Sequence, residues 1–432
     1  MEQTIGPARK MSGEVLVPGE LEAAEKALVL AVLAEGESLV QNVPPAIQTL
    51  VLVLKALGAE IQRQKNDLTV RGRGLRGFRA TETRLELEPL HEDTALLLLA
   101  LLAGQSFVAK LRPGRHCHLC EQLLQLLAPM GTGIEHLDDD AIGVGGRAKL
   151  QGVDHGQVDM PFASKLALLV AGLYAEGATR FREALKSRDR VAHHLRQRQV
   201  EVERTRGEGG EHYLVSIEGG QALKPLAVEI AGQLPLAYPF VVAALGLKGS
   251  NLRLRHLMVR SENRAFLDLV RQIGAPIELE EGGDGTTDLI VRAGAVKSTR
   301  IAAGRMEKVV DHVALLAVLA TQGTGQFVLR DIEYLRRGDY DFVAHLVGLL
   351  RQVYPKVGEF PEGLVVDGGL ALSGGVIDSR GDLGLVQAFA VAGLLAEAEM
   401  TIQGTECLDT IYPGFFATLE AVKETRKSRA RG

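Results

Sequence analysis

The sequence predicts an α/β protein of two similar lobes, each built from three repeats of a βαβαββ-type unit. An apolar helix pattern rich in Ala, Val and Leu recurs six times and ends near a glycine. A stretch that alternates apolar and polar residues, as strands do, typically follows it. The six helical stretches are residues 26–36, 94–104, 165–177, 238–249, 311–323 and 386–398.

These repeated helices indicate the number of lobes. Because apolar residues cover every face, each helix should be buried, and the nearby glycine suits a left-handed C-cap. Successive helices lie roughly 60–75 residues apart, which is the length of a supersecondary unit and too short for a domain. A second helix, a turn and another strand complete each unit, as in residues 50–64 and 266–280. Six buried helices divide into two groups of three, so we expect two lobes with a cleft between them.

Composition excludes several classes of protein. The 432 residues are 46% hydrophobic and 24% charged, which is typical of globular chains. A net charge of −5 gives no basic surface for nucleic acid. The longest apolar run, about ten residues from Ala95, is half a membrane span, so no membrane partner is expected. Three cysteines and an N-terminus without an apolar signal region predict a cytoplasmic protein.

Several stretches resemble one family of transferases. They are LVLKALGAEI (52–61), LVAGLYAEGATRFRE (169–183), SRDR (187–190), RDIEYLRRGDYD (330–341), DSRGD (378–382), AFAVAGLLAE (388–397) and YPGFF (412–416). The chain is similar over nearly its whole length to the 5-enolpyruvylshikimate-3-phosphate (EPSP) synthases of the shikimate pathway. The resemblance implies the paired inverse α/β barrels of that family. One lobe would span 20–222, and the other would join 1–19 to 223–432.

The resemblance also implies a reaction, the transfer of enolpyruvyl from phosphoenolpyruvate to shikimate 3-phosphate with release of phosphate. Both substrates carry phosphate and carboxylate groups, which leave water only when cations pair with them. Acid and base groups must move protons on the enol carbon. No cofactor is expected here.

Most of the family's binding positions carry other residues in this chain. Positions that are Arg or Lys in the family, or part of its phosphate-binding serine–serine–glutamine segment, correspond to Leu21, Lys26, Leu96, His118, Pro161, Phe162, Ala163, Gly338, Phe342, Gly384 and Thr410. Glu22 replaces a serine, and Asp339 replaces a glutamate. Losing one charged partner of a buried anion costs roughly 2–5 kcal/mol. The replacements therefore predict that this chain does not bind the family's substrates.

A few family positions are retained. Asp311 matches the acid/base aspartate and is the one catalytic candidate, although an Asp before an apolar helix is also a normal N-cap. Ser187 matches a serine that holds the shikimate phosphate. Lys165, Asp378, Ser379 and Asp382 match in framework roles.

The candidate ligand-binding residues of the cleft come from the replaced family positions, from the retained ones and from charged residues near them. They are Glu20, Glu22, Lys26, His91, Glu92, Lys165, Ser187, Arg188, Asp339 and Arg380. His91, Glu92 and Asp93 would suit a cationic or hydroxylated ligand, or they are a capped helix start with Asp93 or Thr94 as cap. Basic residues at 188–194, 336–337 and 380 form a ligand patch or solvated surfaces.

The segment RHCHLC (115–120) holds two His and two Cys. Imidazole and thiolate suit zinc. The four residues are too crowded to bind one ion together, no second ligand pair has the usual spacing, and ordinary helix-surface and core positions explain them better. We therefore predict no metal site.

Three hypotheses remain from the sequence. In the first, the chain is a pseudoenzyme, with the transferase fold retained as a binding or interaction module for a small molecule or a protein partner. In the second, it is an enzyme that acts on a different, non-phosphorylated or cationic ligand in the same cleft. In the third, it is an authentic synthase.

Overall fold

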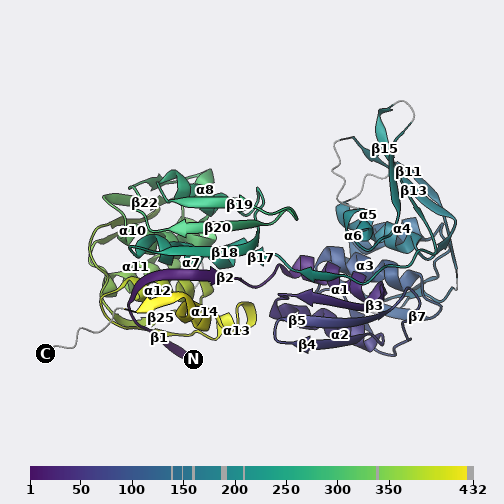
Figure 1. The fold of residues 1–432 in the computed structure, drawn as a ribbon, viewed down its shortest axis with the longest axis horizontal. Coiled ribbons are helices and arrows are strands. Elements are labelled where there is room, and N and C mark those ends of the chain that lie inside the picture. The colour runs from purple at the N-terminus through teal and green to yellow at the C-terminus, as the bar shows by residue number, and fades with distance from the viewer. Residues whose placement is uncertain are drawn as a thin grey trace. The chain divides into compact units, whose positions relative to one another are not determined.

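The computed structural model describes residues 1–137, 140–147, 149–157, 161–185, 192–207, 210–336 and 340–425. These residues form two compact units (Figure 1). The first lobe is Gly19–Ile230, and the second lobe joins Met1–Pro18 to Ala231–Gly432.

The first lobe repeats one sheet three times. The strands are β3 (Glu35–Gln41), β4 (Glu60–Gln64), β5 (Asp67–Arg73), β6 (Leu85–Glu86), β7 (Val108–Arg112), β8 (Ile134–His136), β9 (Ile142–Gly145), β10 (Leu150–Gln151), β11 (Asp154–Gln157), β12 (Ala175–Glu176), β13 (Ala178–Ala184), β14 (Val202–Arg206), β15 (His212–Glu218) and β16 (Ala227–Glu229). The sheet orders are β16-β3-β5-β4, β6-β7-β9-β8 and β11-β13-β15-β14. In each sheet the first pair of strands is parallel and the next two pairs are antiparallel.

Helices complete the three units of the first lobe. They are α1 (Leu21–Leu33), η1 (Pro45–Ile47), α2 (Gln48–Ala56), α3 (Glu92–Ala103), η2 (Gly114–His116), α4 (Cys117–Leu127), α5 (Phe162–Gly172) and α6 (His193–Arg196). The side chains of α3 show why these helices form the core. Every residue from Thr94 to Ala103 is buried, so no polar face is available to water.

The second lobe uses the same sheet order. Its strands are β1 (Glu2–Ile5), β2 (Ala8–Val15), β17 (Gly232–Gln233), β18 (Asn251–Met258), β19 (Ile277–Glu281), β20 (Thr287–Arg292), β21 (Arg300–Ile301), β22 (Gln326–Arg330), β23 (Val357–Phe360), β24 (Gly363–Asp367), β25 (Gly375–Asp378), β26 (Met400–Gln403) and β27 (Lys423–Thr425). The order β21-β22-β24-β23 repeats the pattern, and so does β2-β18-β20-β19 with β27 added to β2. The third sheet, β1-β26-β25, has three strands.

The helices of the second lobe follow the same plan. They are α7 (Leu234–Gly246), α8 (Ala265–Gln272), α9 (Gly304–Glu307), η4 (Val310–His312), α10 (Val313–Thr321), η5 (Glu333–Arg336), α11 (Phe342–Val353), α12 (Leu383–Leu395), α13 (Cys407–Ile411) and α14 (Phe415–Val422). Helices α7, α10 and α12 are buried along almost their whole length and pack together in the core of this lobe.

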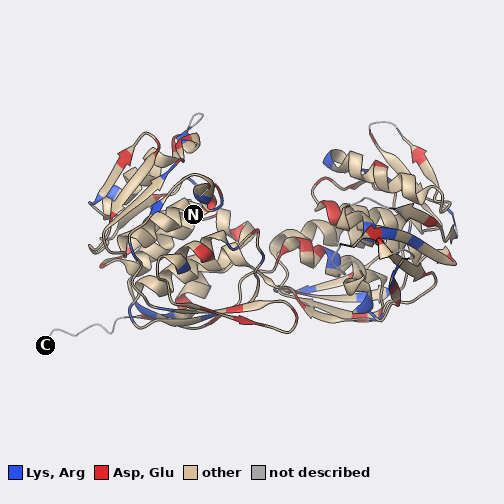
Figure 2. Ribbon diagram, turned by 90° about the horizontal axis from the view of Figure 1, so that it is seen from above, with Lys and Arg blue, Asp and Glu red and all other residues tan. Residues whose placement is uncertain are grey.

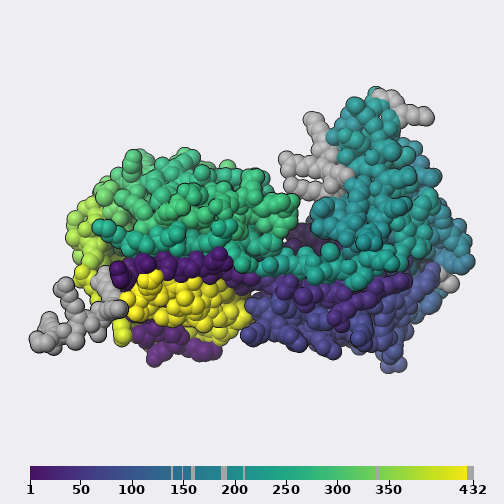
Figure 3. All heavy atoms as spheres, in the orientation of Figure 1, coloured from purple at the N-terminus to yellow at the C-terminus, as the bar shows by residue number. Residues whose placement is uncertain are grey.

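The N-terminal segment belongs to the second lobe because its strands pair there. Strand β2 pairs with β18 in parallel and with β27, while β1 pairs with β26. In Figure 3 the purple N-terminal residues accordingly lie against green and yellow residues of this lobe. Residues of both charge signs are distributed over each lobe (Figure 2).

The predicted fold class is confirmed, while two details differ from expectation. The first lobe ends at Ile230 rather than at 222, since β16 pairs with β3 and Leu223 bridges to Ala34. Within the described residues, no helix is both long and apolar enough to cross a membrane.

The glycines that end the repeated stretches do not act as left-handed C-caps in the way expected. Gly36, Gly177 and Gly249 have positive φ, but each lies two or more residues beyond the C-cap of its helix. Gly104 is the C-cap of α3 with φ −85°. A Cβ at this position would lie 2.2 Å from the ring of Tyr174. The close approach of that ring, rather than a positive φ, is what requires glycine here.

Candidate functional site

A pocket of about 410 Å³ lies at one end of the first lobe's core helices. The first turns of α1 and α3 and the segment from η2 into α4 supply its walls. Its lining residues are Glu22, His91, Glu92, Asp93, Arg115, His116 and Leu119. The structure thus brings together three of the predicted candidates, Glu22, His91 and Glu92.

Lys26 joins two walls of this pocket. Its Nζ lies 2.5 Å from Glu22 Oε1 and 2.9 Å from Asp93 Oδ2, and its side chain is 10% exposed. The ring of Phe162 lies 5.7 Å from the same nitrogen. Burial alone would lower the pKa of Lys26, but the carboxylates of Asp93 and Glu22 outweigh burial and raise it above its ordinary value. Lys26 is therefore a protonated cation whose charge is balanced within the lobe.

Carboxylates outnumber cations around the pocket. Glu22, Glu92 and Asp93 line it together with one guanidinium, that of Arg115. Arg115 is exposed and donates to the carbonyl oxygen of Leu90 at 3.3 Å. Such a wall favours a cationic or hydroxylated ligand over a phosphate.

Glu20 is not part of this carboxylate group. It occupies the N-cap position of α1, makes no side-chain cap hydrogen bond, and is absent from the pocket lining. The structure thus places Glu22 but not Glu20 in this pocket, and a ligand-binding role for Glu20 in the cleft stays a prediction.

The start of α3 also differs from the simple capping interpretation. His91 is the N-cap residue, and no side chain makes a cap hydrogen bond. Asp93 lies in the first turn, and its carboxylate is directed to Lys26. The prediction of Asp93 or Thr94 as the cap is wrong, since both lie inside the helix.

Lys165 forms part of a buried ion-pair network away from the pocket. Its Nζ lies 3.5 Å from Glu183 Oε2, and Arg204 Nε donates to Glu183 Oε1 at 2.8 Å. Glu183 is 2% exposed. This network links α5 to β13 and β14, which fits the framework role expected for Lys165. The predicted residues Ser187 and Arg188 lie outside the described residues.

In the second lobe, Asp311 is exposed on η4. The N-cap position of α10 is His312, and the Asp311 side chain makes no cap hydrogen bond there. The helix-cap interpretation of Asp311 is therefore wrong, while its acid/base role stays a prediction. Burial lowers the pKa of the neighbouring His312 to about 4. The His312 ring packs edge-on against Tyr238 at 4.9 Å between ring centroids.

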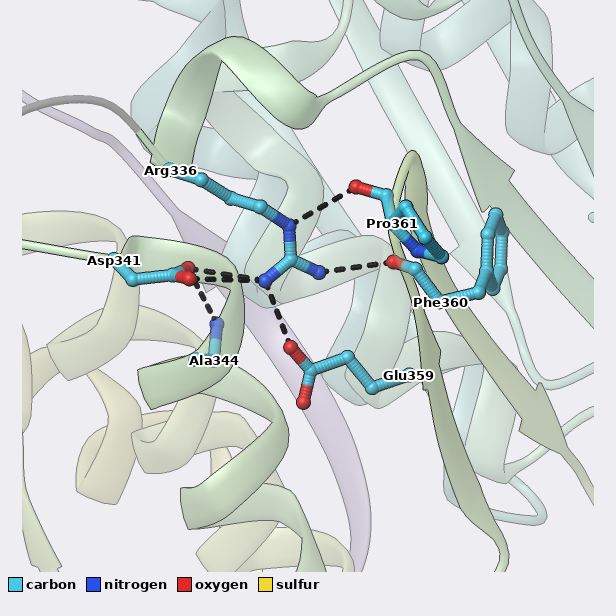
Figure 4. A network of polar contacts seen from close by, with 6 residues as sticks. All are labelled: Arg336, Asp341, Ala344, Glu359, Phe360 and Pro361. Atoms are coloured by element: carbon cyan, nitrogen blue, oxygen red, sulfur yellow. Dashed lines mark hydrogen bonds and ion pairs between the residues drawn. The ribbon is translucent and has the colours of Figure 1, made fainter.

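Two arginines of this lobe have different surroundings. Arg380 is exposed, and its guanidinium lies 5.4 Å from the centroid of the Tyr340 ring. Arg336 is only 18% exposed and binds Asp341, Glu359 and the carbonyl oxygens of Phe360 and Pro361 (Figure 4).

Arg336 is thus a structural residue rather than part of a solvated surface. The candidate Asp339 and its neighbours Arg337 and Gly338 lie outside the described residues.

The His and Cys residues of RHCHLC face different surroundings. His116 is buried and its Nε2 lies 3.0 Å from Leu90 O, whereas His118 contacts Gln122 on the surface. Cys117 is exposed and Cys120 is buried in the core. Arg115 and His116 belong to η2 and line the pocket, and the other four residues are surface and core positions of α4.

Two residues near the pocket went unnoticed in the sequence. Arg115 was considered only as a neighbour of the His and Cys residues. Glu25 is 1% exposed, and its Oε2 accepts a hydrogen bond from His91 N at 3.2 Å. The sequence did indicate that Glu25 is unusual, because Glu25 and Lys26 are charged residues that directly precede the apolar run of a helix expected to be buried.

Similarity to known proteins agrees with this fold. The family described as EPSP synthase (3-phosphoshikimate 1-carboxyvinyltransferase) matches residues 5–419. A 3-phosphoshikimate 1-carboxyvinyltransferase of Coxiella burnetii is 31% identical, covering 100% of this chain and 99% of its own length. One of Brevibacillus brevis is 29% identical, covering 96% of this chain and 99% of its own. The EPSP synthase structure from Acinetobacter baumannii superimposes with a TM-score of 0.71 at 22% identity, covering 98% of this chain and 99% of that one. This chain belongs to the EPSP synthase family.

Proposed function

We propose that this chain has lost enolpyruvyl transfer and acts as a binding or interaction protein on the EPSP synthase fold. The supporting observation is the pair of contacts from Lys26 to Glu22 and Asp93. A cation that would meet a phosphate is already neutralised by two carboxylates of its own lobe.

Electrostatics explain why this arrangement opposes phosphate. Two unit charges 4 Å apart interact by about 4 kcal/mol at an effective dielectric constant near 20. A phosphate beside Lys26 would be attracted by the ammonium group and repelled by the two carboxylates that already bind it, and Lys26 could not leave its partners without exposing them to each other. Leu96 stands at a position that is arginine in the family. Its side chain is apolar and fully buried, so this position supplies no charge for a phosphate.

The test is turnover by the purified full chain. Phosphate release from phosphoenolpyruvate and shikimate 3-phosphate should not exceed the rate without protein, while an active synthase assayed in parallel turns over. Neither substrate should raise the melting temperature of the full chain. Turnover, or a rise of several degrees with either substrate, would contradict the proposal.

One observation favours a second candidate, a ligand that is cationic. Glu22, Glu92 and Asp93 line one pocket. We propose small organic amines as this ligand class. Spermidine and 1,4-diaminobutane should then raise the melting temperature at fixed ionic strength, and Glu92→Gln should weaken the effect. If the amines do not raise the melting temperature, or if they raise that of Glu92→Gln equally, the support for this candidate is removed.

We also propose a cytoplasmic location, with a small molecule or a protein as partner. The three cysteines are free thiols in the structure, and free thiols persist in a reducing compartment. Cell fractionation checks the location, and recovery of the chain from an oxidising compartment would contradict it.

A further inference from the structure

A second pocket, of about 420 Å³, lies at the opposite end of the first lobe's core helices from Lys26. The residues that follow the C-terminal ends of α1 and α5 line it, together with the segment after β5. Its ionisable lining residues are Glu35, Arg73, Arg76, Lys149, Tyr174 and Glu176. None of the candidate residues from the sequence lies here, so this pocket is separate from the one beside Lys26.

Tyr174 is the most buried of these side chains, with 3% of its surface exposed. Its hydroxyl oxygen lies 3.2 Å from Gln105 Nε2. The same nitrogen lies 2.9 Å from Leu101 O and 3.0 Å from Leu75 O. An amide nitrogen has two hydrogens and accepts none, and the two carbonyl oxygens account for both hydrogens.

The hydroxyl hydrogen of Tyr174 therefore has no acceptor among the described residues. Burial raises the pKa of this phenol, so the group stays neutral and keeps its hydrogen. A buried donor without an acceptor costs free energy, and native proteins leave few of them. Because Tyr174 lines the pocket, the donor indicates an acceptor atom that is bound there.

Glu35 supplies the complementary group of the pocket. Its side chain is exposed and forms no hydrogen bond or ion pair within the described part of the chain. A carboxylate accepts hydrogen bonds and donates none. The pocket thus offers a donor at Tyr174 and an acceptor at Glu35. A hydroxyl group both accepts and donates, so hydroxyl groups of one ligand can serve both.

The charges around the pocket favour a neutral ligand. Lys149 pairs with Glu176 inside the lining, and Arg73 pairs with Glu60 just beyond it. The remaining lining charges are of opposite sign, Arg76 and Glu35. Such a balanced wall gives neither an amine nor an oxyanion a net attraction.

We propose that this pocket binds a small, neutral polyhydroxyl compound of the sugar or cyclitol class. One ligand hydroxyl accepts the hydrogen of Tyr174, and another donates to the carboxylate of Glu35. The inference does not depend on the proposed loss of enolpyruvyl transfer, since the two pockets share no lining residue.

The test uses the full chain with D-glucose and myo-inositol as probes. Trimethylamine N-oxide at the same molarity controls for general stabilisation by excluded solutes, because it has no hydroxyl group. A probe at about ten times its dissociation constant should raise the melting temperature by about 3–5 °C. The backbone amide resonances of Arg76 and Tyr174 should shift with the same saturation curve.

Two variants should weaken this response. Tyr174→Phe removes the donor and keeps the ring, and Glu35→Met removes the acceptor and keeps an unbranched side chain. Each should lower the affinity for the probe about tenfold, as expected for a lost hydrogen bond to a polar ligand. Glu37→Met is the matched control, because Glu37 is exposed on the same strand, β3, and lies outside the lining. It should respond as the wild-type chain does.

Other results overturn the inference. One is a wild-type chain that responds to neither probe, or no more than to trimethylamine N-oxide. Another is an unchanged response in Tyr174→Phe. If Tyr174→Phe does not fold, the comparison of Glu35→Met with Glu37→Met decides, and equal responses of these two variants contradict the proposed site.

Discussion

Lys26 Nζ lies 2.9 Å from Asp93 Oδ2, although the two residues are 67 positions apart in the sequence. The contact joins the second turn of α1 to the first turn of α3, and both side chains are largely buried. Because Glu22 accepts a second bond from the same ammonium group, two of its three N–H donors are used within the lobe and its charge is balanced by two carboxylates. The loss of phosphate binding proposed here depends on this relationship.

Removing the ammonium group of Lys26 should reveal the repulsion between the carboxylates of Glu22 and Asp93. Lys26→Met leaves Glu22 and Asp93 close together without a counter-charge. The free energy of unfolding should fall by about 2–3 kcal/mol at pH 7, as judged by urea denaturation.

A compensating variant controls for lost packing. Lys26→Met combined with Glu22→Gln and Asp93→Asn removes the repulsion, so most of the stability should return. If the triple variant is no more stable than Lys26→Met, the charge balance around Lys26 is not what holds these helices together.

His312 should make the stability of the second lobe depend on pH. Burial lowers its folded-state pKa from the ordinary 6.5 to about 4, so the unfolded chain binds more protons between these values. Stability is therefore full above pH 6.5 and falls by about 2–3 kcal/mol as pH drops toward 4. His312→Phe keeps an aromatic ring against Tyr238 and should flatten this dependence in urea titrations between pH 4 and 7. A variant with the same pH slope as wild type would show that His312 is not the titrating group.

Arg336 should be needed for the stability of the second lobe. Its guanidinium bonds Asp341, Glu359 and two carbonyl oxygens, and Asp341 in turn caps α11 (Figure 4). Arg336→Met should lower the free energy of unfolding by about 2–4 kcal/mol. Arg336→Lys keeps the charge but not the forked geometry, so its loss should be smaller yet measurable. If Arg336→Met leaves the free energy of unfolding unchanged, this arginine behaves as a solvated surface residue after all.

The all-round burial of α3 predicts a large packing effect. Leu97→Ala, at a fully buried position, should cost about 3–5 kcal/mol. Leu52→Ala on α2, where the side chain is 60% exposed, is the control and should cost less than about 1 kcal/mol. Chemical denaturation of both variants checks the contrast, and equal losses would contradict the repeated-core architecture.

The architecture was readable from the sequence because burial leaves a direct pattern. A helix such as α3, with Ala and Leu on every side, can be stable only inside a core, and six such helices require shared cores. The sheet order was not readable, since the strand that completes a sheet often comes from far along the chain. Strand β16 pairing with β3 shifted the lobe boundary to Ile230 for this reason.

The site was only partly predictable for a similar reason. The sequence indicated the excess of acids at Glu22, Glu92 and Asp93, and the 410 Å³ pocket gathers them. The spacing of Glu22 and Lys26 suits a pair on one helix face, but their shared partner Asp93 belongs to another helix. Likewise, nothing local to Glu25 indicates that its carboxyl group meets the N–H of His91.

The most direct test of the central claim is titration calorimetry of the wild-type chain with shikimate 3-phosphate and phosphoenolpyruvate, separately and together. The charge balance at Lys26 predicts no saturable binding up to about 1 mM, the upper end of ordinary enzyme substrate affinities. Saturable binding of either substrate in the micromolar range would show that this lobe still accepts a phosphate, and would contradict the account.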